Sequence, residues 1–226
     1  HERIGRIAAA AAAWGVAEFW LTGGEPFLLA DIADSIRACV AYRPTTVLTN
    51  GMLFRGARLE RLQRLPRTDL SLQISLDSPS PERHDRVRGQ GSWARAMAGI
   101  RTACDLGFHV RVAATVDPAD RQHMAELAGF TAVLDEFGID RDDLLIRPVA
   151  RRGFAGSGLE LAPDMLVPEV TITAGGVYWH PVGAADSDML VDTEIFPLGE
   201  RIDRVIDLFE DRARRLSSAA LMFPCA

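Results

Sequence analysis

The chain has 226 residues, of which 48% are hydrophobic and 25% charged, and its formal net charge is −6. This is enough for one α/β core with at most one small extra domain. The acidic balance, with arginines spread rather than clustered, argues against a nucleic-acid partner. No apolar run is long enough to cross a bilayer and no secretory signal is evident, so we expect a cytoplasmic protein without a membrane partner.

Strand-like and helix-like segments alternate through the first two thirds of the chain. The pattern predicts helices over residues 2–14, 30–41, 58–65, 93–106 and 122–137, and strands over residues 17–21, 46–49, 70–76, 109–115 and 144–148. Such alternation is typical of parallel strands joined by right-handed helical crossovers. Because the chain opens on a helix, we expect one further strand upstream of His1.

The composition and the periodicity of the sequence change after Pro148. Residues 151–168 are rich in glycine and proline and are predicted to form a linker or binding loop. Residues 170–179 predict a β-hairpin with a glycine turn, and residues 202–216 predict an amphipathic helix. We therefore predict two domains, residues 1–160 and residues 161–226.

The most informative motif joins the first predicted strand to the helix after it, and reads Thr22-Gly23-Gly24-Glu25-Pro26. Glycines let the backbone approach a ligand closely, and α/β folds bind ligands at the carboxyl ends of their strands. A carboxylate there suits an ammonium or a hydroxyl and repels a phosphate. The motif therefore indicates an amine-bearing cofactor; the alternative is a glycine turn with a solvated, helix-capping glutamate.

Further motifs follow the next strands in order. They are Thr49-Asn50-Gly51, Ser75-Leu76-Asp77, and the segment His84 to Gly89 with Gly91 and Trp93. Together with the glycine motif, they make residues 1–150 resemble radical S-adenosylmethionine (SAM) enzymes. The resemblance implies an α/β partial TIM barrel of the (β/α)6 type. Its first strand and cluster loop are missing here, and a small C-terminal β-hairpin and helix extension is present.

The resemblance also implies a SAM site. In the family the glycines and the glutamate hold the amino group of SAM, the matching serine donates to its carboxylate, and the matching arginine binds that carboxylate. The residues implied for the cofactor site are Thr22, Gly23, Gly24, Glu25, Pro26, Thr49, Asn50, Ser75, Asp77, Arg88, Arg111, Arg147 and Val149.

Some assignments stay open within this set. Thr49 to Gly51 also suits an ordinary strand-to-helix turn. Arg147 is a candidate for contact with SAM or substrate, or for a structural ion pair. Asp85 is interpreted as a helix cap or a partner of Arg88, and His84 as structural.

Family members bind a 4Fe–4S cluster through a C-x3-C-x2-C loop, and nothing here has that spacing. The three cysteines, Cys39, Cys104 and Cys225, are scattered. We expect the cluster cysteines upstream of His1; the alternative is a degenerate member without radical chemistry. Cys39 and Cys104 are predicted core residues. Cys225 resembles the start of an auxiliary-cluster ligand pair, and His180 is a surface residue or a substitute ligand.

The C-terminal region resembles the start of the SPASM or twitch extension of radical SAM maturases. This implies reductive cleavage of SAM to a 5′-deoxyadenosyl radical that removes hydrogen from a ribosomally made peptide. The electron donor would be a flavodoxin or ferredoxin. The alternatives are a dehydrogenase or other enzyme of a small polar metabolite, and a non-catalytic barrel scaffold that binds a peptide without a cluster.

Overall fold

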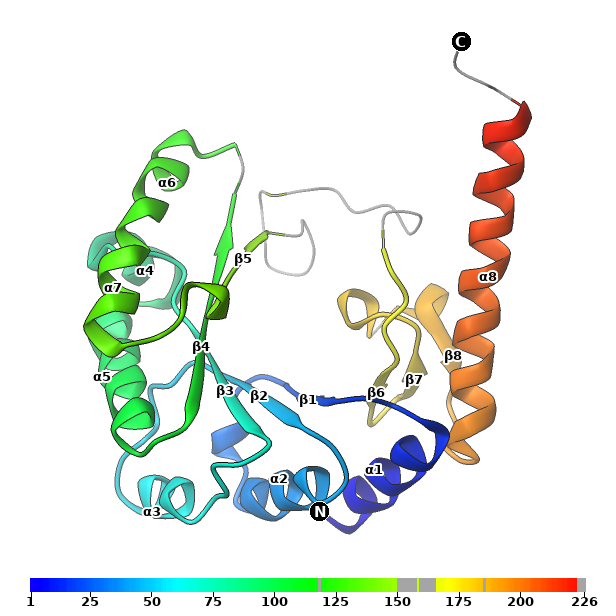
Figure 1. Cartoon of the computed structure of the whole chain (residues 1–226), viewed down its shortest axis with the longest axis horizontal. Coiled ribbons are helices and arrows are strands. Elements are labelled where there is room, and N and C mark those ends of the chain that lie inside the picture. The colour runs from blue at the N-terminus through cyan, green and yellow to red at the C-terminus, as the bar shows by residue number, and fades with distance from the viewer. Residues whose placement is uncertain (118, 150–157, 159–165, 185, 223–226) are drawn as a thin grey trace. The chain divides into compact units, whose positions relative to one another are not determined.

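A computed structural model describes residues 1–117, 119–149, 158, 166–184 and 186–222 (Figure 1). The described residues fall into two compact units, residues 1–149 with residue 158, and residues 166–222. The predicted domain boundary near residue 160 lies outside the described residues and stays a prediction.

The first unit is built on five parallel strands that pair in chain order. The sheet curls into a half-barrel with the helices on its outer side (Figure 1). This confirms the predicted partial TIM barrel. The strands are β1 (Phe19–Leu21), β2 (Thr45–Thr49), β3 (Leu70–Ser75), β4 (His109–Val116) and β5 (Leu144–Pro148).

Side chains alternate between the two faces of this sheet, as strand geometry requires. On β4 the residues facing the helices are almost fully buried, whereas the intervening ones are more exposed. We call the face turned away from the helices the lumen face. On β4 its residues are His109, Arg111, Ala113 and Thr115.

The helices largely follow the sequence pattern. They are α1 (Glu2–Trp14), α2 (Ile32–Val40), α3 (Ala57–Gln63), α4 (Pro81–Arg88), α5 (Ser92–Asp105), α6 (Arg121–Glu126) and α7 (Phe130–Phe137). The prediction of one helix over residues 122–137 was wrong, because a 3-10 turn at Leu127–Gly129 divides it. Gly129 lies so close to Pro79 that an added Cβ would be 2.9 Å from the proline ring.

Helix α4 was not predicted, although the sequence carries its start signals. Ser80 caps it by accepting a hydrogen bond from the Arg83 amide, and Pro81 takes the first helical position. Its composition hides it, because almost every residue is polar. The helix matters because it brings Arg88 back to the carboxyl end of β3.

The second unit holds an antiparallel three-stranded sheet and one long helix. The predicted hairpin is confirmed as β6 (Thr171–Thr173) and β7 (Gly176–Tyr178). The third strand, β8 (Leu190–Asp192), was not predicted. Helix α8 (Leu198–Met222), which packs on β8, is longer at both ends than predicted. No helix within the described ranges has the length and apolarity needed to span a membrane.

Candidate functional site

Glu25 lies at the carboxyl end of the sheet, directly after β1. Its Oε1 accepts hydrogen bonds from the Phe27 amide at 3.0 Å and the Thr49 hydroxyl at 2.8 Å. Its Oε2 accepts one from the Asn50 amide at 2.8 Å. All three donors are neutral, and Glu25 has no cationic partner among the described residues. A carboxylate has about four acceptor positions, so Oε2 can still accept an N–H from an ammonium.

The glycines before Glu25 border open space. An ideal Cβ added to Gly23 or to Gly24 would have no other atom within 4 Å. Thr22 is also exposed, whereas Pro26 is buried and begins a 3-10 turn. The backbone here is therefore accessible to a ligand, and side chains in place of the glycines would occupy the ligand's space.

Ser75 ends β3 on the lumen face. Its neighbours Ile74 and Leu76 are fully buried on the opposite face, as the sequence pattern predicted. The Ser75 side chain is half-buried, and its hydroxyl makes no hydrogen bond to any described residue. It is therefore free to donate to a ligand at the carboxyl end of the sheet.

Arg88 and Asp77, both implied for the cofactor site, form an ion pair with each other. Arg88 Nε donates to Asp77 Oδ2 at 2.5 Å, and Nη2 donates to Oδ1 at 3.2 Å. The Thr115 amide also donates to Asp77 Oδ1, at 3.0 Å. Asp77 is only 4% exposed. Among its described contacts, Arg88 Nη1 has no partner and Nη2 uses one of its two N–H groups, so the outer edge of the guanidinium can still donate to a ligand carboxylate.

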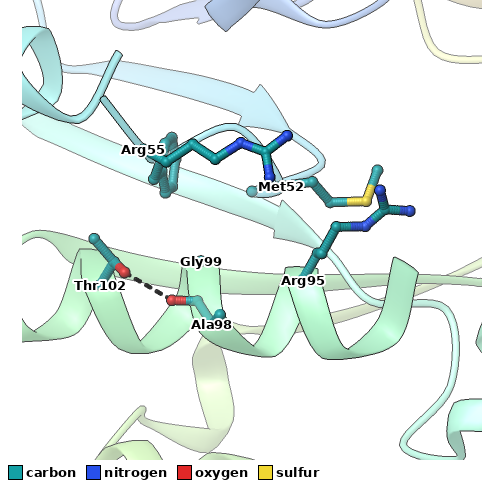
Figure 2. Close-up of a pocket in the computed structure, with 8 residues that line it drawn as sticks. Met52, Arg55, Arg95, Ala98, Gly99 and Thr102 are labelled. Carbon is teal, nitrogen blue, oxygen red and sulfur yellow. Dashed lines mark hydrogen bonds between the residues drawn. The ribbon is translucent and has the colours of Figure 1, made fainter. Parts of the chain in front are cut away.

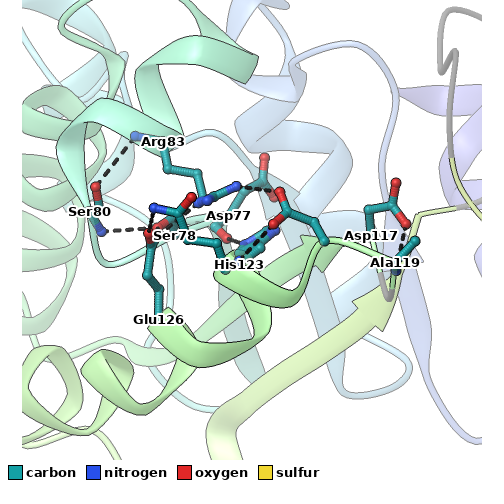
Figure 3. A network of polar contacts seen from close by, with 10 residues as sticks. Asp77, Ser78, Ser80, Arg83, Asp117, Ala119, His123 and Glu126 are labelled. Atoms are coloured by element: carbon teal, nitrogen blue, oxygen red, sulfur yellow. Dashed lines mark hydrogen bonds and ion pairs between the residues drawn. The ribbon is translucent and has the colours of Figure 1, made fainter.

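The main chain of Asp77 is held by two histidines. Its amide donates to His84 Nδ1 at 3.2 Å. Its carbonyl accepts from His123 Nε2 at 2.8 Å (Figure 3). His84 is 1% exposed, and burial lowers the pKa of its imidazole. A neutral His84 that accepts at Nδ1 carries its proton on Nε2, which is buried without a partner. Both histidines therefore position Asp77.

Asp85 caps the start of α5 and is not the partner of Arg88. It accepts hydrogen bonds from the amides of Trp93 and Gly91 and from the Ser92 hydroxyl. These bonds, the one from the Trp93 amide first, lower the pKa of the Asp85 carboxyl. Of the two interpretations left open by the sequence, the helix cap is confirmed.

A second network, which the sequence did not reveal, joins α4 to the start and end of α6. Arg83 donates to Asp120 at 2.6 Å and to Glu126 at 2.8 Å, and Ser78 also reaches Glu126 (Figure 3). Arg83 is largely buried between these partners. The network anchors the segment that follows β3 and therefore the N-terminal end of α4, the helix that carries Arg88.

Two arginines predicted as site residues lie on the lumen face. Arg111 on β4 and Arg147 on β5 both approach the indole of Trp20 on β1. Arg111 also lies 3.6 Å from Asp143. Val149 follows β5, where its amide bonds to the Val116 carbonyl. Sequence reasoning missed Trp20, although its alternation with Phe19 and Leu21 placed it on this face.

The structure also shows a pocket on the helix side of the sheet, between the β2–α3 loop and α5 (Figure 2). The residues that line it include Met52, Arg55 and Arg95 together with Gly51 and Gly99. An added Cβ on Gly99 would lie 2.1 Å from the Gly51 carbonyl oxygen, so the two backbones are in direct contact. The pocket is separate from the lumen face and shares only Gly51 with the motifs.

The described residues fit SAM but not an iron–sulfur cluster. Among the described residues, Glu25 has a carboxylate without a cationic partner, and Ser75 has a hydroxyl without a hydrogen bond. The backbone at Gly24 borders open space. No group of three potential metal ligands occurs among the residues that the structure describes. Cys39 is buried in the core, which raises the pKa of its thiol to about 11, and Cys104 is half-buried. Both are core residues as predicted, and Cys225 lies outside the described residues.

Comparisons with known proteins identify the family of this chain. The sequence profile of the Radical SAM superfamily matches residues 1–130. The chain is 34% identical over 142 residues to the antilisterial bacteriocin subtilosin biosynthesis protein AlbA of Bacillus subtilis, covering 57% of this chain and 31% of that protein. It is 35% identical over 133 residues to the GTP 3′,8-cyclase of Yersinia pestis, covering 56% of this chain and 40% of that protein.

The fold is also similar to a solved structure. The crystal structure of Streptococcus suis SuiB matches with a TM-score of 0.57 at 20% identity, covering 72% of this chain and 36% of that one. All three matches span less than half of the relative's length. The chain belongs to the radical SAM superfamily, a family that uses SAM and an iron–sulfur cluster.

Proposed function

We propose that this chain is the SAM-binding half-barrel of a radical SAM enzyme that modifies a ribosomally made peptide. The observation that carries the SAM part is Glu25. Its carboxylate is half-buried at the carboxyl end of the sheet, and the hydrogen bonds it accepts from residues that the structure describes all come from neutral donors. An anion in this position is stabilised by a cationic ligand, and the ammonium of SAM is one.

Each site residue then has a stated task. Glu25 accepts an N–H of the ammonium through the free position on Oε2. Ser75 donates its hydroxyl to the carboxylate of SAM, and Arg88 donates from Nη1 while Asp77 holds its other nitrogens. Gly24 leaves room for the methionyl chain beside the backbone. Thr49 and Asn50 keep Glu25 in place.

Bound beside a 4Fe–4S cluster, SAM supplies a 5′-deoxyadenosyl radical in this family. The residues described here hold and orient SAM and do not ligate the cluster. A flavodoxin or ferredoxin would supply the electron. Residues 161–226 are proposed as a SPASM- or twitch-like extension that governs the substrate.

The peptide substrate is supported by the subtilosin biosynthesis relative and by the C-terminal hairpin. A second candidate is a small polar metabolite, because GTP 3′,8-cyclases are similar to this chain at comparable identity. The two candidates differ in what the lumen must accept, an extended peptide or a compact polyanion.

Anaerobic reconstitution of the complete gene product with iron and sulfide tests this function. With SAM and a reductant, we expect slow formation of 5′-deoxyadenosine without substrate, and faster formation with the peptide substrate. SAM binding without 5′-deoxyadenosine would instead support the non-catalytic scaffold. Stimulation by GTP and not by peptide would support the second candidate.

A further inference from the structure

Side chains from opposite edges of the half-barrel meet on the lumen face. The guanidinium carbon of Arg111 lies 5.6 Å from the centroid of the Trp20 ring, and that of Arg147 lies 5.9 Å from it. Trp20 is on β1 and Arg147 on β5, so only the curl of the sheet brings them together. The face of an indole attracts cations at this range. Trp20 therefore draws both arginines towards one region of the lumen.

Two buried polar groups in this region lack partners. Gln73 is the register neighbour of Arg111 on β3, it is 4% exposed, and its Oε1 accepts no hydrogen bond. Arg111 Nε is also buried without a hydrogen bond, because the nearest Asp143 oxygen is 3.6 Å away. Buried polar side chains in native proteins nearly always have partners. An anionic ligand in the lumen would accept a hydrogen bond from Arg111 Nε, whereas Gln73 Oε1, itself an acceptor, needs a donor from elsewhere.

The charges around the region favour a singly charged anion. Asp143 partly offsets Arg111 and also binds His109 at 2.8 Å through its other oxygen. Arg147 is exposed, and no acidic residue of the described chain pairs with it. Two arginines and one aspartate leave one positive charge unmatched. A carboxylate cancels that charge, whereas a phosphate or polyphosphate brings more negative charge than the region can balance.

We infer that Arg111, Arg147 and Gln73 form a carboxylate-binding site in the lumen, which anchors an acidic group of the substrate. The guanidinium forks suit a carboxylate, and the Gln73 amide can donate to it. Gln73 precedes Ser75 by two residues on the same face, so the site lies about 7 Å deeper than the SAM carboxylate site. This placement assigns the two arginines to the substrate, and it rests on the proposed function for that ligand's identity.

The test is a nuclear magnetic resonance titration of the ¹⁵N-labelled 226-residue chain, following the indole N–H of Trp20 and the Nε–H of Arg111. The probes are N-acetylglutamate α-amide for an acidic side chain, N-acetylglycine for a terminal carboxylate, inorganic phosphate, and the neutral N-acetylglutamine amide, at constant ionic strength. We expect saturable shifts with one or both carboxylates and none with the neutral amide. The two carboxylate arms identify which source the site prefers.

Variants link the binding to these residues. Arg147→Gln is expected to weaken carboxylate binding at least tenfold, and Arg111→Gln and Gln73→Leu to weaken it as well. Arg55→Gln, on the separate helix-side pocket, is the matched control and is expected to bind as the wild type does. Because Arg147 is exposed, its variant retains the fold and carries the test even if a buried variant does not fold.

Unchanged binding in Arg147→Gln, or no saturable shift in the wild type, would overturn the site. Tighter binding of phosphate than of either carboxylate would overturn its assignment to carboxylates. The titration needs no SAM, iron or reductant. Carboxylate binding by this chain, together with no 5′-deoxyadenosine from the reconstituted complete gene product, would therefore refute the proposed function and leave this site standing.

Discussion

Glu25 and Asp77 follow strands of the same parallel sheet, but they differ in the groups that bind their carboxylates. Asp77 is 4% exposed and is paired with the guanidinium of Arg88. Glu25 is less buried and, among the described residues, is hydrogen-bonded only by two amides and a hydroxyl. Within the described part of the chain, the Asp77 carboxylate is thus paired with a cation, whereas the Glu25 carboxylate is not.

This difference separates residues that hold the site from residues that bind the cofactor. A carboxylate at the carboxyl end of a strand is a ligand-binding group only if its charge is left for the ligand. By that criterion Glu25 contacts SAM, and Asp77 positions Arg88. The predictions below change one end at a time.

The largest expected effect is on stability and comes from the contact between Gly99 and Gly51, which follows the Thr49 and Asn50 that hold Glu25. Gly99→Ala places a Cβ 2.1 Å from the Gly51 carbonyl oxygen, and this backbone cannot move aside cheaply. We expect a loss of about 3 kcal/mol in the free energy of unfolding, measured by urea denaturation. Gly24→Ala, where the added Cβ meets nothing within 4 Å, is the matched control and should keep its stability. Equal stability of the two variants would contradict this packing.

Asp77→Asn should be destabilising because it leaves Arg88 without its anion. Arg88 is 30% exposed, so water recovers part of the loss, and we expect about 2–3 kcal/mol in the free energy of unfolding. A double-mutant cycle with Arg88→Gln isolates the pair. A stability loss under 0.5 kcal/mol would show that the Asp77 end does not depend on this ion pair.

Ser75→Ala should affect SAM binding and not folding, because the Ser75 hydroxyl makes no hydrogen bond within the described chain. A hydrogen bond to a charged carboxylate contributes about 1.5 kcal/mol, so we expect about tenfold weaker SAM binding by calorimetry. Ser71→Ala, four residues deeper on the same face of the same strand, is the control. Wild-type affinity in the Ser75 variant would place the SAM carboxylate elsewhere.

The smallest expected effect is on the pH dependence of stability. Burial lowers the pKa of His84 below its ordinary value of 6.5, so the folded protein binds the proton more weakly than the unfolded chain does. The folded state therefore has its full stability from this group above pH 6.5. As the pH falls below 6.5, the free energy of unfolding decreases by no more than about 1.4 kcal/mol per pH unit. His84→Asn should reduce this slope in urea denaturation, and the exposed His1→Asn should not. An unchanged slope would mean that His84 does not titrate this way.

Local patterns in the sequence were sufficient to predict most of the helices and strands. Alternation on β4 and helical periodicity in α5 are set by burial within one element, so they are visible in the sequence. The split between α6 and α7, at a point where Gly129 lies close to the distant Pro79, was not predicted.

The same distinction between local and long-range features applies to the candidate site. The position of Glu25 follows from its motif, because a turn after a parallel strand always lies at the same edge of the sheet. The partner of Arg88 could not be predicted, since it depends on how α4 folds back over the end of β3. The meeting of Trp20 with Arg147 depends on the curl of all five strands, which no local pattern encodes.

SAM binding to Glu25→Gln tests the central claim most directly. The variant keeps the shape of the side chain but removes the charge that faces the ammonium. Calorimetry of the reconstituted protein should show SAM binding weakened by about 1.5–3 kcal/mol, which is roughly 10- to 150-fold. Glu18→Gln, on an exposed residue just before β1, should bind SAM as the wild type does. Equal affinity in Glu25→Gln and the wild type, with both folded, would contradict the assignment of Glu25 to the ammonium.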